Sequence, residues 1–187
     1  MRARYPTRLL FPKSGRALLS RYPVLESAVR LDPGGRPGSA VLLARLDLGA
    51  GRQLTVLVAH PLPPLADLPL SWDAAPRDAE IAFVRSVVDE QVRLGRRVLL
   101  VGDFNVTDRE PGGRELTRGL TDAHATAGWG PGESWAPPAL RRRGVALVRI
   151  DRVLAGPGVT PTAFDTDCTW YGSDHCVLHA TVAVDPR

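Results

Sequence analysis

Two kinds of hydrophobic pattern alternate along the chain. Short apolar runs, bounded by glycine, proline or other turn-forming residues, predict β-strands. These runs are Arg16–Ser20, Ser39–Leu48, Gln53–Ala59, Arg97–Val101, Leu147–Ala155, Thr160–Thr166 and Val177–Val184. Gly49-Ala50-Gly51 separates the second run from the third, and such a short glycine-containing connection predicts a β-hairpin.

The pattern changes to a helical spacing after the hairpin. The apolar positions that recur three or four residues apart are Ile81, Val84, Val88 and Val92. Pro76 suits the first turn of a helix, where its missing N–H is not needed, and Gly95 is a natural C-terminal cap. We therefore expect an amphipathic helix over Pro76–Leu94 and a second, short helix over Glu115–Ala125.

The order of these elements indicates the fold class. Strands arrive both in hairpins and after a helix, which favours a layered α/β sandwich of two mixed, largely antiparallel sheets flanked by helices. With 187 residues, 44% of them apolar, the chain is expected to form a single domain over residues 1–187. It contains no run of about 18 apolar residues, so no transmembrane helix is predicted.

The charge and the cysteine content say little about which partners the protein binds or in which cellular compartment it works. All but one of the 24 basic residues are arginine, and the net charge of +4 is compatible with a polyanionic partner without establishing one. Cys168 and Cys176 are too few to staple a chain of this size, and their spacing matches no structural zinc site. The simplest interpretation is two buried thiols, and a disulfide between them is the alternative.

Three segments place polar groups at the tips of apolar strands. They are Gly102-Asp-Phe-Asn105, Arg149-Ile-Asp151 and Ser173-Asp-His175. Each also has a structural interpretation, because Asp103, Asn105 and Asp174 can cap turns and Asp151 can pair with a neighbouring arginine. Their joint occurrence, in this order, is far more specific than any one of them.

Together these segments resemble the successive motifs of the endonuclease/exonuclease/phosphatase superfamily. That family includes pancreatic-type deoxyribonucleases, apurinic endonucleases, neutral sphingomyelinases and inositol polyphosphate phosphatases. Gly15–Pro23, Val56–His60 and Gly132–Trp135 are similar to three further motifs of the family. The resemblance extends over essentially the whole chain.

The resemblance implies a catalytic set. Asp103 would bind or orient the attacking water, and Asn105 would donate a hydrogen bond to the phosphate. His175 would contact the scissile phosphate, with Asp151 fixing its tautomer and favouring the imidazolium. His60 would be a second phosphate donor or the general acid for the leaving oxygen.

The resemblance also implies a divalent metal, Mg²⁺ or Mn²⁺, because phosphoester cleavage needs charge neutralisation and an activated water. Asp103 and Asp174 are its expected ligands, since Mg²⁺ prefers carboxylate oxygens. The other two histidines, His124 and His179, are expected to be structural.

Four residues near the last two motifs are candidates for substrate binding. Arg141 and Arg142 can form a phosphate clamp or, as charge runs often do, a solvated loop. Trp170 and Tyr171 can stack on the substrate or simply pack at the rim of the site.

One part of the family's pattern is missing. Members carry two strands before the segment matching Gly15–Pro23, the first with an active-site asparagine and the second ending in the glutamate that is the principal metal ligand. Here only Met1–Ser14 precedes that segment, and it contains no Glu, Asp or Asn. Glu26 follows the motif and is expected to be an exposed strand or loop residue. We therefore expect an N-terminally truncated domain, the C-terminal three-quarters of the usual one, that is either a fragment of a normal enzyme or a genuinely shortened relative.

The expected function is divalent-metal-dependent hydrolysis of phosphoester bonds, of the phosphodiesterase or nuclease kind. Nucleic acid is placed slightly ahead of lipid or small phosphoesters as the substrate. The alternative is a non-catalytic or partner-completed phosphate-binding domain that keeps the fold but lacks the glutamate ligand. A cytoplasmic location is the default expectation, and it holds only if no N-terminal segment is missing.

Overall fold

The computed structural model describes residues 4–12, 15–34, 39–67 and 71–186. Its strands are β1 (Thr7–Phe11), β2 (Arg16–Ser20), β3 (Val24–Leu31), β4 (Ala40–Gly49), β5 (Arg52–Ala59), β6 (Leu65–Asp67), β7 (Ser71–Asp73), β8 (Val98–Asp103), β9 (Thr121–Asp122), β10 (Asp151–Ala155), β11 (Val159–Asp167) and β12 (Val177–Val184). Its helices are α1 (Ala75–Arg93), α2 (Pro111–Thr117), α3 (Ala123–Ala127) and α4 (Pro138–Arg141). The predicted α/β fold is confirmed.

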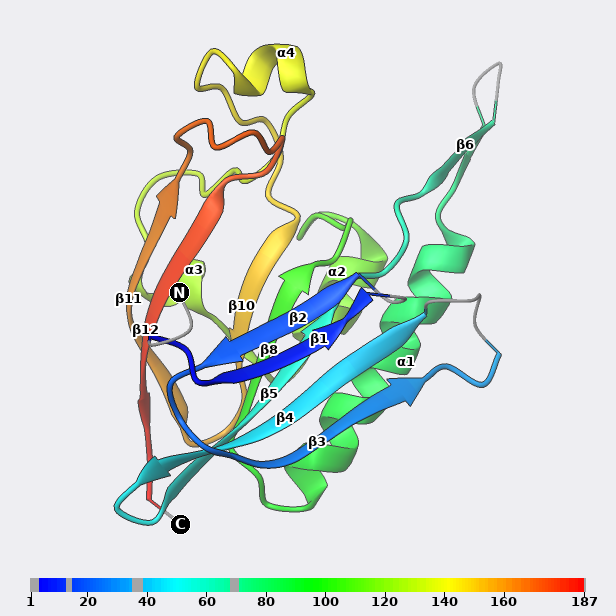
Figure 1. Ribbon diagram of the computed structural model, residues 1–187. Helices are drawn as coiled ribbons and strands as arrows, with labels where there is room; N and C mark the ends of the chain where they lie inside the picture. The colour runs from blue at the N-terminus through cyan, green and yellow to red at the C-terminus, as the bar shows by residue number, and fades with distance from the viewer. Residues whose placement is uncertain (1–3, 13–14, 35–38, 68–70, 187) are drawn as a thin grey trace.

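A six-stranded mixed sheet forms the centre, in the order β3-β4-β5-β8-β10-β9. The predicted hairpin is its β4–β5 pair. β5 and β8 are parallel neighbours joined through α1, whereas β10 runs antiparallel to β8 (Figure 1). A parallel pair needs a crossover connection, and the helix supplies it. The carboxyl ends of β5 and β8 therefore meet the start of β10 at one edge of the sheet.

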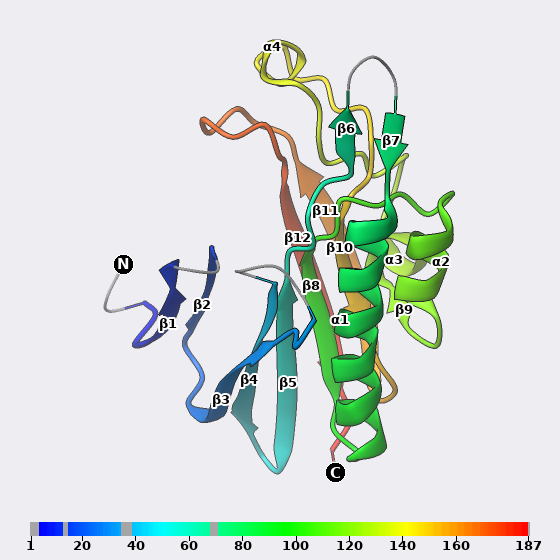
Figure 2. The same cartoon turned by 90° about the vertical axis from the view of Figure 1, so that its right-hand side faces the viewer.

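Helix α1 covers one face of this sheet (Figure 2). The predicted boundaries, Pro76–Leu94, agree with the observed helix to within one residue at each end. Ile81, Val84 and Val88 are buried against strand residues such as Leu57 and Leu100. Full burial of each such side chain contributes about 1.5–3 kcal/mol. Among the described helices, none combines the length and the apolar character needed to cross a membrane.

The other face is covered by two separate hairpins. β1 pairs with β2, and β11 pairs with β12, both antiparallel. Leu9 and Leu18 from the first hairpin and Val182 from the second join the same apolar cluster as Leu46 and Val56 of the central sheet. The β1–β2 hairpin lies on the side of the sheet opposite to α1 (Figure 2). The second layer thus consists of two-stranded units.

Two boundaries differ from the sequence prediction. The single helix expected over Glu115–Ala125 is wrong, because α2 ends at Thr117, β9 follows, and α3 begins only at Ala123. Gly119, at φ +69°, takes the chain out of the helical region, and the Asp122 carboxylate then caps α3. The expected strand over Leu147–Ala155 is shorter, since β10 begins at Asp151.

The interpretation of Cys168 and Cys176 as free thiols is also wrong, because they form a disulfide. Asp167 of β11 is the register partner of Val177 of β12, so the two cysteines occupy the next facing positions beyond the ladder. Their Cα atoms lie 4.4 Å apart, within disulfide range. Spacing along the sequence did not reveal this register.

Candidate active site

The strand register brings the predicted polar residues together. Asp103, the last residue of β8, is the direct cross-strand partner of Asp151, the first residue of β10. Ala59 pairs with Gly102 in the parallel β5–β8 ladder, so His60 emerges beside Asp103. Gly102 itself permits this approach: at φ +153°, a Cβ there would lie 1.9 Å from the Ala59 carbonyl oxygen. Three adjacent strands thus deliver three functional groups to one edge.

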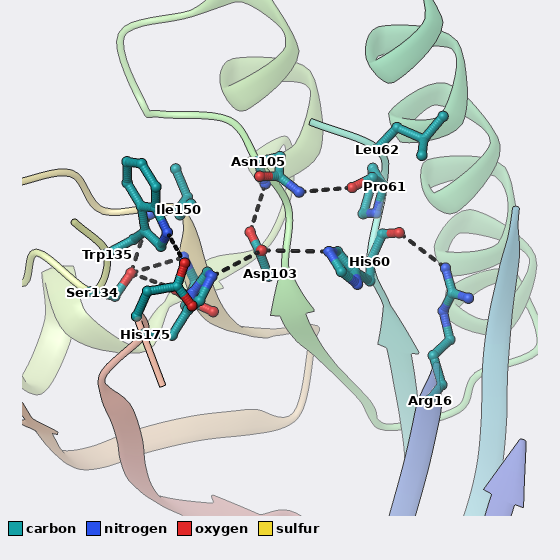
Figure 3. Close-up of polar contacts among 12 residues, drawn as sticks. Arg16, His60, Pro61, Leu62, Asp103, Asn105, Ser134, Trp135, Ile150 and His175 are labelled. Carbon is teal, nitrogen blue, oxygen red and sulfur yellow. Dashed lines mark hydrogen bonds and ion pairs between the residues drawn. The ribbon is translucent and has the colours of Figure 1, made fainter. Parts of the chain in front are cut away.

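Two histidines flank the Asp103 carboxylate (Figure 3). Its Oδ2 lies 3.5 Å from Nε2 of His60 and 3.7 Å from Nε2 of His175. The other ring nitrogen of His175, Nδ1, is 2.9 Å from Oδ2 of Asp151. The predicted Asp151–His175 pairing is therefore present, and the arginines beside Asp151 pair with Asp122 instead.

Burial and neighbouring charges shift the protonation of this cluster. Burial, and then the nearby Asp151 carboxylate, raise the pKa of Asp103 above its ordinary value; the Asn105 amide and the two histidines oppose this rise. The hydrogen bond to Asp151 is the main cause that raises the pKa of His175, which favours its imidazolium form. The cluster thus combines a partly buried carboxylate that tends to keep a proton or attract a cation with a well-oriented proton donor.

Asn105 shapes the turn after β8 and also lines the pocket beside the site. Its backbone N–H donates to Oδ1 of Asp103 at 2.9 Å, and its side-chain Nδ2 donates to the Pro61 carbonyl at 2.9 Å. The residue adopts φ +50°, a region that asparagine tolerates better than most residues. Nη1 of Arg77, fully buried in the first turn of α1, donates to the Asn105 carbonyl at 2.9 Å and holds this turn.

The Gly132–Trp135 segment supplies two site residues, Ser134 and Trp135, to which the sequence alone assigned no role. The Ser134 hydroxyl donates to Oδ2 of Asp151 at 2.6 Å and accepts the Asp151 backbone N–H at 3.1 Å. The Trp135 indole N–H donates to Oδ2 of Asp174 at 3.0 Å. Ser134 is fully buried. These residues fix the carboxylates of Asp151 and Asp174, which flank His175. The similarity of the segment to a family motif was the feature of the sequence that could have indicated this role.

The group able to hold a metal differs in part from the predicted pair. Within the described residues, Asp103, Asp151 and His175 offer ligand atoms that all lie within 4.8 Å of one another. Asp174, the second predicted ligand, instead has a carboxylate oxygen bound by the Trp135 indole and lies outside this group. Carboxylate oxygens are the ligands that Mg²⁺ and Mn²⁺ prefer, so the donor set suits either ion.

The four candidates for substrate binding separate into buried and exposed positions. Arg141 is fully buried, and its Nη2 donates to the Cys168 carbonyl at 2.9 Å, so it has no surface to offer a substrate. The exposed guanidinium of Arg142 lies over the ring of Trp170, 5.5 Å from its centroid. Tyr171 is exposed and donates its hydroxyl to Asp167. Arg142, Trp170 and Tyr171 remain accessible near the His175 loop.

The remaining predicted positions lie away from the cluster. His124 lies in α3 and packs edge-on against Phe164, 5.5 Å between ring centroids. His179 lies on β12 opposite Asp165 of β11. Glu26 lies in β3, is partly exposed and pairs with Arg45 and Arg96.

A largely apolar pocket of about 370 Å³ adjoins the site. It is lined by Pro63, Pro64, Asn105, Thr107, Glu110, Trp135, Val148 and Ile150. Asn105 belongs to both the polar turn and this pocket, and Trp135 connects the pocket to Asp174. A group attached to a phosphate held by the cluster would therefore meet an apolar surface on this side.

A sequence profile described as the endonuclease/exonuclease/phosphatase family matches residues 5–175, nearly the whole chain. The chain belongs to this family. Its members are hydrolases that act on phosphoesters. No curated protein matches the sequence significantly.

Solved structures of low sequence identity share the fold. A functionally unknown conserved protein from Enterococcus faecalis V583 is 18% identical with a TM-score of 0.73, over 96% of this chain and 77% of that one. A mannosyl-6-phosphatase from Bacteroides thetaiotaomicron is 13% identical with a TM-score of 0.64, over 89% and 70%. TDP2 from D. rerio, in complex with a single-strand DNA product, is 18% identical with a TM-score of 0.64, over 88% and 69%.

Proposed function

We propose that this protein hydrolyses phosphodiesters with the help of a divalent cation, Mg²⁺ or Mn²⁺. The observation that carries the proposal is the placement of the Asp103 carboxylate between His60 and His175, with Asp151 bonded to the second histidine. A phosphodiester is an anion, so its attack by water requires donors for the phosphate and a group that orients the water. The cluster offers both kinds of group within a few ångströms.

Each residue has a role that follows from its position. Asp103, with its raised pKa, orients and deprotonates the attacking water. His175, held by Asp151 and favoured in its charged form, donates from Nε2 to the phosphate. Asn105 keeps one side-chain N–H beyond the one given to Pro61 and can donate it to a phosphate oxygen. His60, half-exposed at the rim, protonates the leaving oxygen.

Asp103 and Asp151 would hold the cation, because they supply the oxygens of the ligand group. When bound, such an ion neutralises phosphate charge and lowers the pKa of a bound water. Two carboxylates close together, one of them with a raised pKa, are an arrangement that a cation relieves. Asp174 supports the site from the side of Trp135.

The adjoining pocket supports a substrate with an apolar or flat group next to the phosphate. A nucleoside has such a group, and the partly exposed Trp170 and the exposed Tyr171 offer rings on which a base can stack. The D. rerio TDP2 structure, which contains a single-strand DNA product, is a precedent for nucleic acid on this fold. We therefore place nucleic acid ahead of lipid and small phosphoesters.

A second candidate function is phosphate binding without turnover. It is favoured by the small number of side chains that can bind a metal ion. Within the described residues the group offers two carboxylates and one imidazole, and Oδ2 of Asp151 is already bonded to Ser134 and His175. A cation with so few free oxygens binds weakly. The domain would then recognise a phosphate with its histidines and Asn105 but cleave it slowly or not at all.

The test measures hydrolysis of bis-(p-nitrophenyl) phosphate and of a single-stranded oligonucleotide, with Mg²⁺, with Mn²⁺ and with EDTA. We expect metal-dependent cleavage that Asp103→Asn lowers about 10³-fold. Asp165→Asn, an exposed carboxylate on β11, is the matched control and should retain full activity. Calorimetric binding of a mononucleotide without any turnover would select the binding function, and the absence of both would refute the proposed site.

A further inference from the structure

A disulfide closes the loop that carries two residues of the site, Asp174 and His175. Between Cys168 and Cys176 lie seven residues, among them Asp174 and His175, and the bridge closes this loop at the end of the β11–β12 ladder. We call residues 168–176 the clasped loop. The two sulfur atoms take no part in the proposed hydrolysis.

Besides the bridge, a set of hydrogen bonds holds the clasped loop against the body of the protein. The Cys176 N–H donates to the Ser134 carbonyl at 2.7 Å, and the Trp135 indole donates to the Asp174 carboxylate. His175 is bonded through Nδ1 to Asp151. The Ala136 N–H also donates to the Asp174 carbonyl at 3.4 Å, and His175 forms an isolated β-bridge with Trp135, but no ladder of the central sheet includes the loop.

One further contact reaches the loop at Cys168. The Arg141 guanidinium is fully buried, yet among the described residues only its Nη2 has a partner, the Cys168 carbonyl; Nε and Nη1 have none. Burying a charged group with so few hydrogen bonds is unfavourable. Losing its one partner would make burial of the guanidinium costlier still, so this bond holds Cys168 in place and the covalent bridge ties the Cys176 end of the loop to it.

We propose that the Cys168–Cys176 disulfide is a redox-sensitive positioning device, and that its reduction releases Asp174 and His175 from the site. This inference rests on the proposed function, because it concerns the same histidine. In the oxidised protein the loop keeps His175 on Asp151. In the reduced protein the loop opens, and the phosphate loses its donor.

The reductant is a dithiol. One of its thiolates attacks Sγ of Cys168, since Cys168 is half-buried whereas Cys176 is only 7% exposed, and the Cys176 thiolate leaves. The second thiolate of the reductant then displaces the Cys168 sulfur. Two electrons and two protons pass to the cysteines, which become thiols, and the dithiol becomes a disulfide.

The first experiment compares turnover of bis-(p-nitrophenyl) phosphate by the oxidised protein and by the protein reduced with dithiothreitol, with free thiols counted by titration. We expect kcat to fall about tenfold to a hundredfold on reduction, because small misplacements of a catalytic group have effects of this size, and to recover on reoxidation. The variant C168S/C176S should show the lower kcat and no response to dithiothreitol, which controls for any effect of the reagent on the metal. Unchanged kcat in fully reduced wild-type protein would overturn the proposal.

The second experiment needs no turnover. In ¹⁵N-labelled protein the Trp135 indole N–H, assigned with Trp135→Phe, should exchange slowly when the disulfide is intact, because it is bonded to Asp174. After reduction it should exchange as fast as the indole of Trp129, which is 97% exposed, while the circular dichroism spectrum stays that of a folded protein. Retained protection of Trp135 in the reduced, folded protein sinks the proposal. If the Trp135 indole loses protection on reduction but the protein never hydrolyses substrate, the role of the disulfide in holding the loop is supported and only the proposed function is refuted.

Discussion

The site is built from two parts that are held in different ways. Asp103, Asp151 and His60 belong to the ends of paired strands in the central sheet, whose apolar residues are buried beneath α1. Asp174 and His175 lie on a loop outside that sheet. The sheet part is positioned by backbone register, and the loop part by side-chain bonds, by backbone hydrogen bonds to Ser134 and Ala136, and by one disulfide.

The two parts of the site owe their precise geometry to different interactions. A strand register cannot shift by one residue without moving every side chain to the other face, so the sheet part is fixed by the same interactions that stabilise the fold. The loop part depends on Ser134, Trp135 and the disulfide, none of which contributes to the central ladders. Changes to the supports of the loop should therefore alter activity more than stability, and changes to the packing between the strands should do the reverse.

The greatest loss of activity is expected for the histidines, one from each part of the site. His175→Gln should lower kcat/KM about 10³-fold, since this imidazole is oriented by Asp151 and is only 28% exposed. His60→Gln should lower it about 10²-fold, because its side chain is 52% exposed and approaches Asp103 only to 3.5 Å. Steady-state kinetics on one substrate measures both. Equal losses would show that the two histidines are positioned equally well.

A change in the sheet part should act on stability. Gly102→Ala places a methyl group 1.9 Å from the Ala59 carbonyl oxygen, so the β5–β8 ladder must separate locally, and we expect a loss of about 3 kcal/mol in the free energy of unfolding. Gly51→Ala is the matched control. It also has positive φ, but nothing lies within 4 Å of its Cβ, and it should cost about 1 kcal/mol. Urea unfolding distinguishes them, and similar losses would contradict the close approach.

Removing one support of the loop part should lower activity moderately. Ser134→Ala deletes the hydroxyl that donates to Asp151, so His175 loses part of its orientation, and we expect kcat to fall about tenfold. Ser86→Ala removes an exposed hydroxyl on α1 and should leave kcat unchanged. If Ser134→Ala changed only the thermal stability, the link between Ser134 and His175 would be disproved.

The smallest effect concerns pH and the turn that holds Asn105. Partial burial favours protonated Glu110, but the Thr107 N–H and hydroxyl and the Arg77 guanidinium outweigh it and hold the pKa of Glu110 below its ordinary value. The ionised group thus stabilises the fold fully above about pH 4.3, and this stability is lost as the pH falls through the lower, folded-state pKa.

Glu110→Gln should therefore destabilise the protein at neutral pH by up to about 1 kcal/mol, and the difference from wild type should shrink below about pH 4. Thermal unfolding across this range provides the measurement. Glu115→Gln, which removes an exposed partner of Arg118, is the control and should show little effect. A difference that persists in acid would mean that Glu110 acts through packing.

Much of this arrangement was predictable from local patterns. The α1 boundaries follow from helical spacing with Pro76 at the start and Gly95 beyond the end, and the β4–β5 hairpin follows from its glycine turn. The helix expected over Glu115–Ala125 was wrong because the pattern ignored the turn at Gly119. The strands β1 and β3 were missed, since both are partly exposed and their apolar residues do not form a clear run.

Local patterns in the chain specify the α/β class, the main helix and hairpin, and the residues at the strand tips, because periodicity, turn chemistry and short motifs are local properties of a chain. Long-range pairing in the folded domain is what brings Asp103 opposite Asp151 in the β8–β10 ladder, Trp135 onto Asp174, and Cys168 onto Cys176. Each of these contacts joins segments through a register or a crossing that no local pattern encodes. Pairing between distant strands sets that geometry, and it depends on the packing of the whole domain.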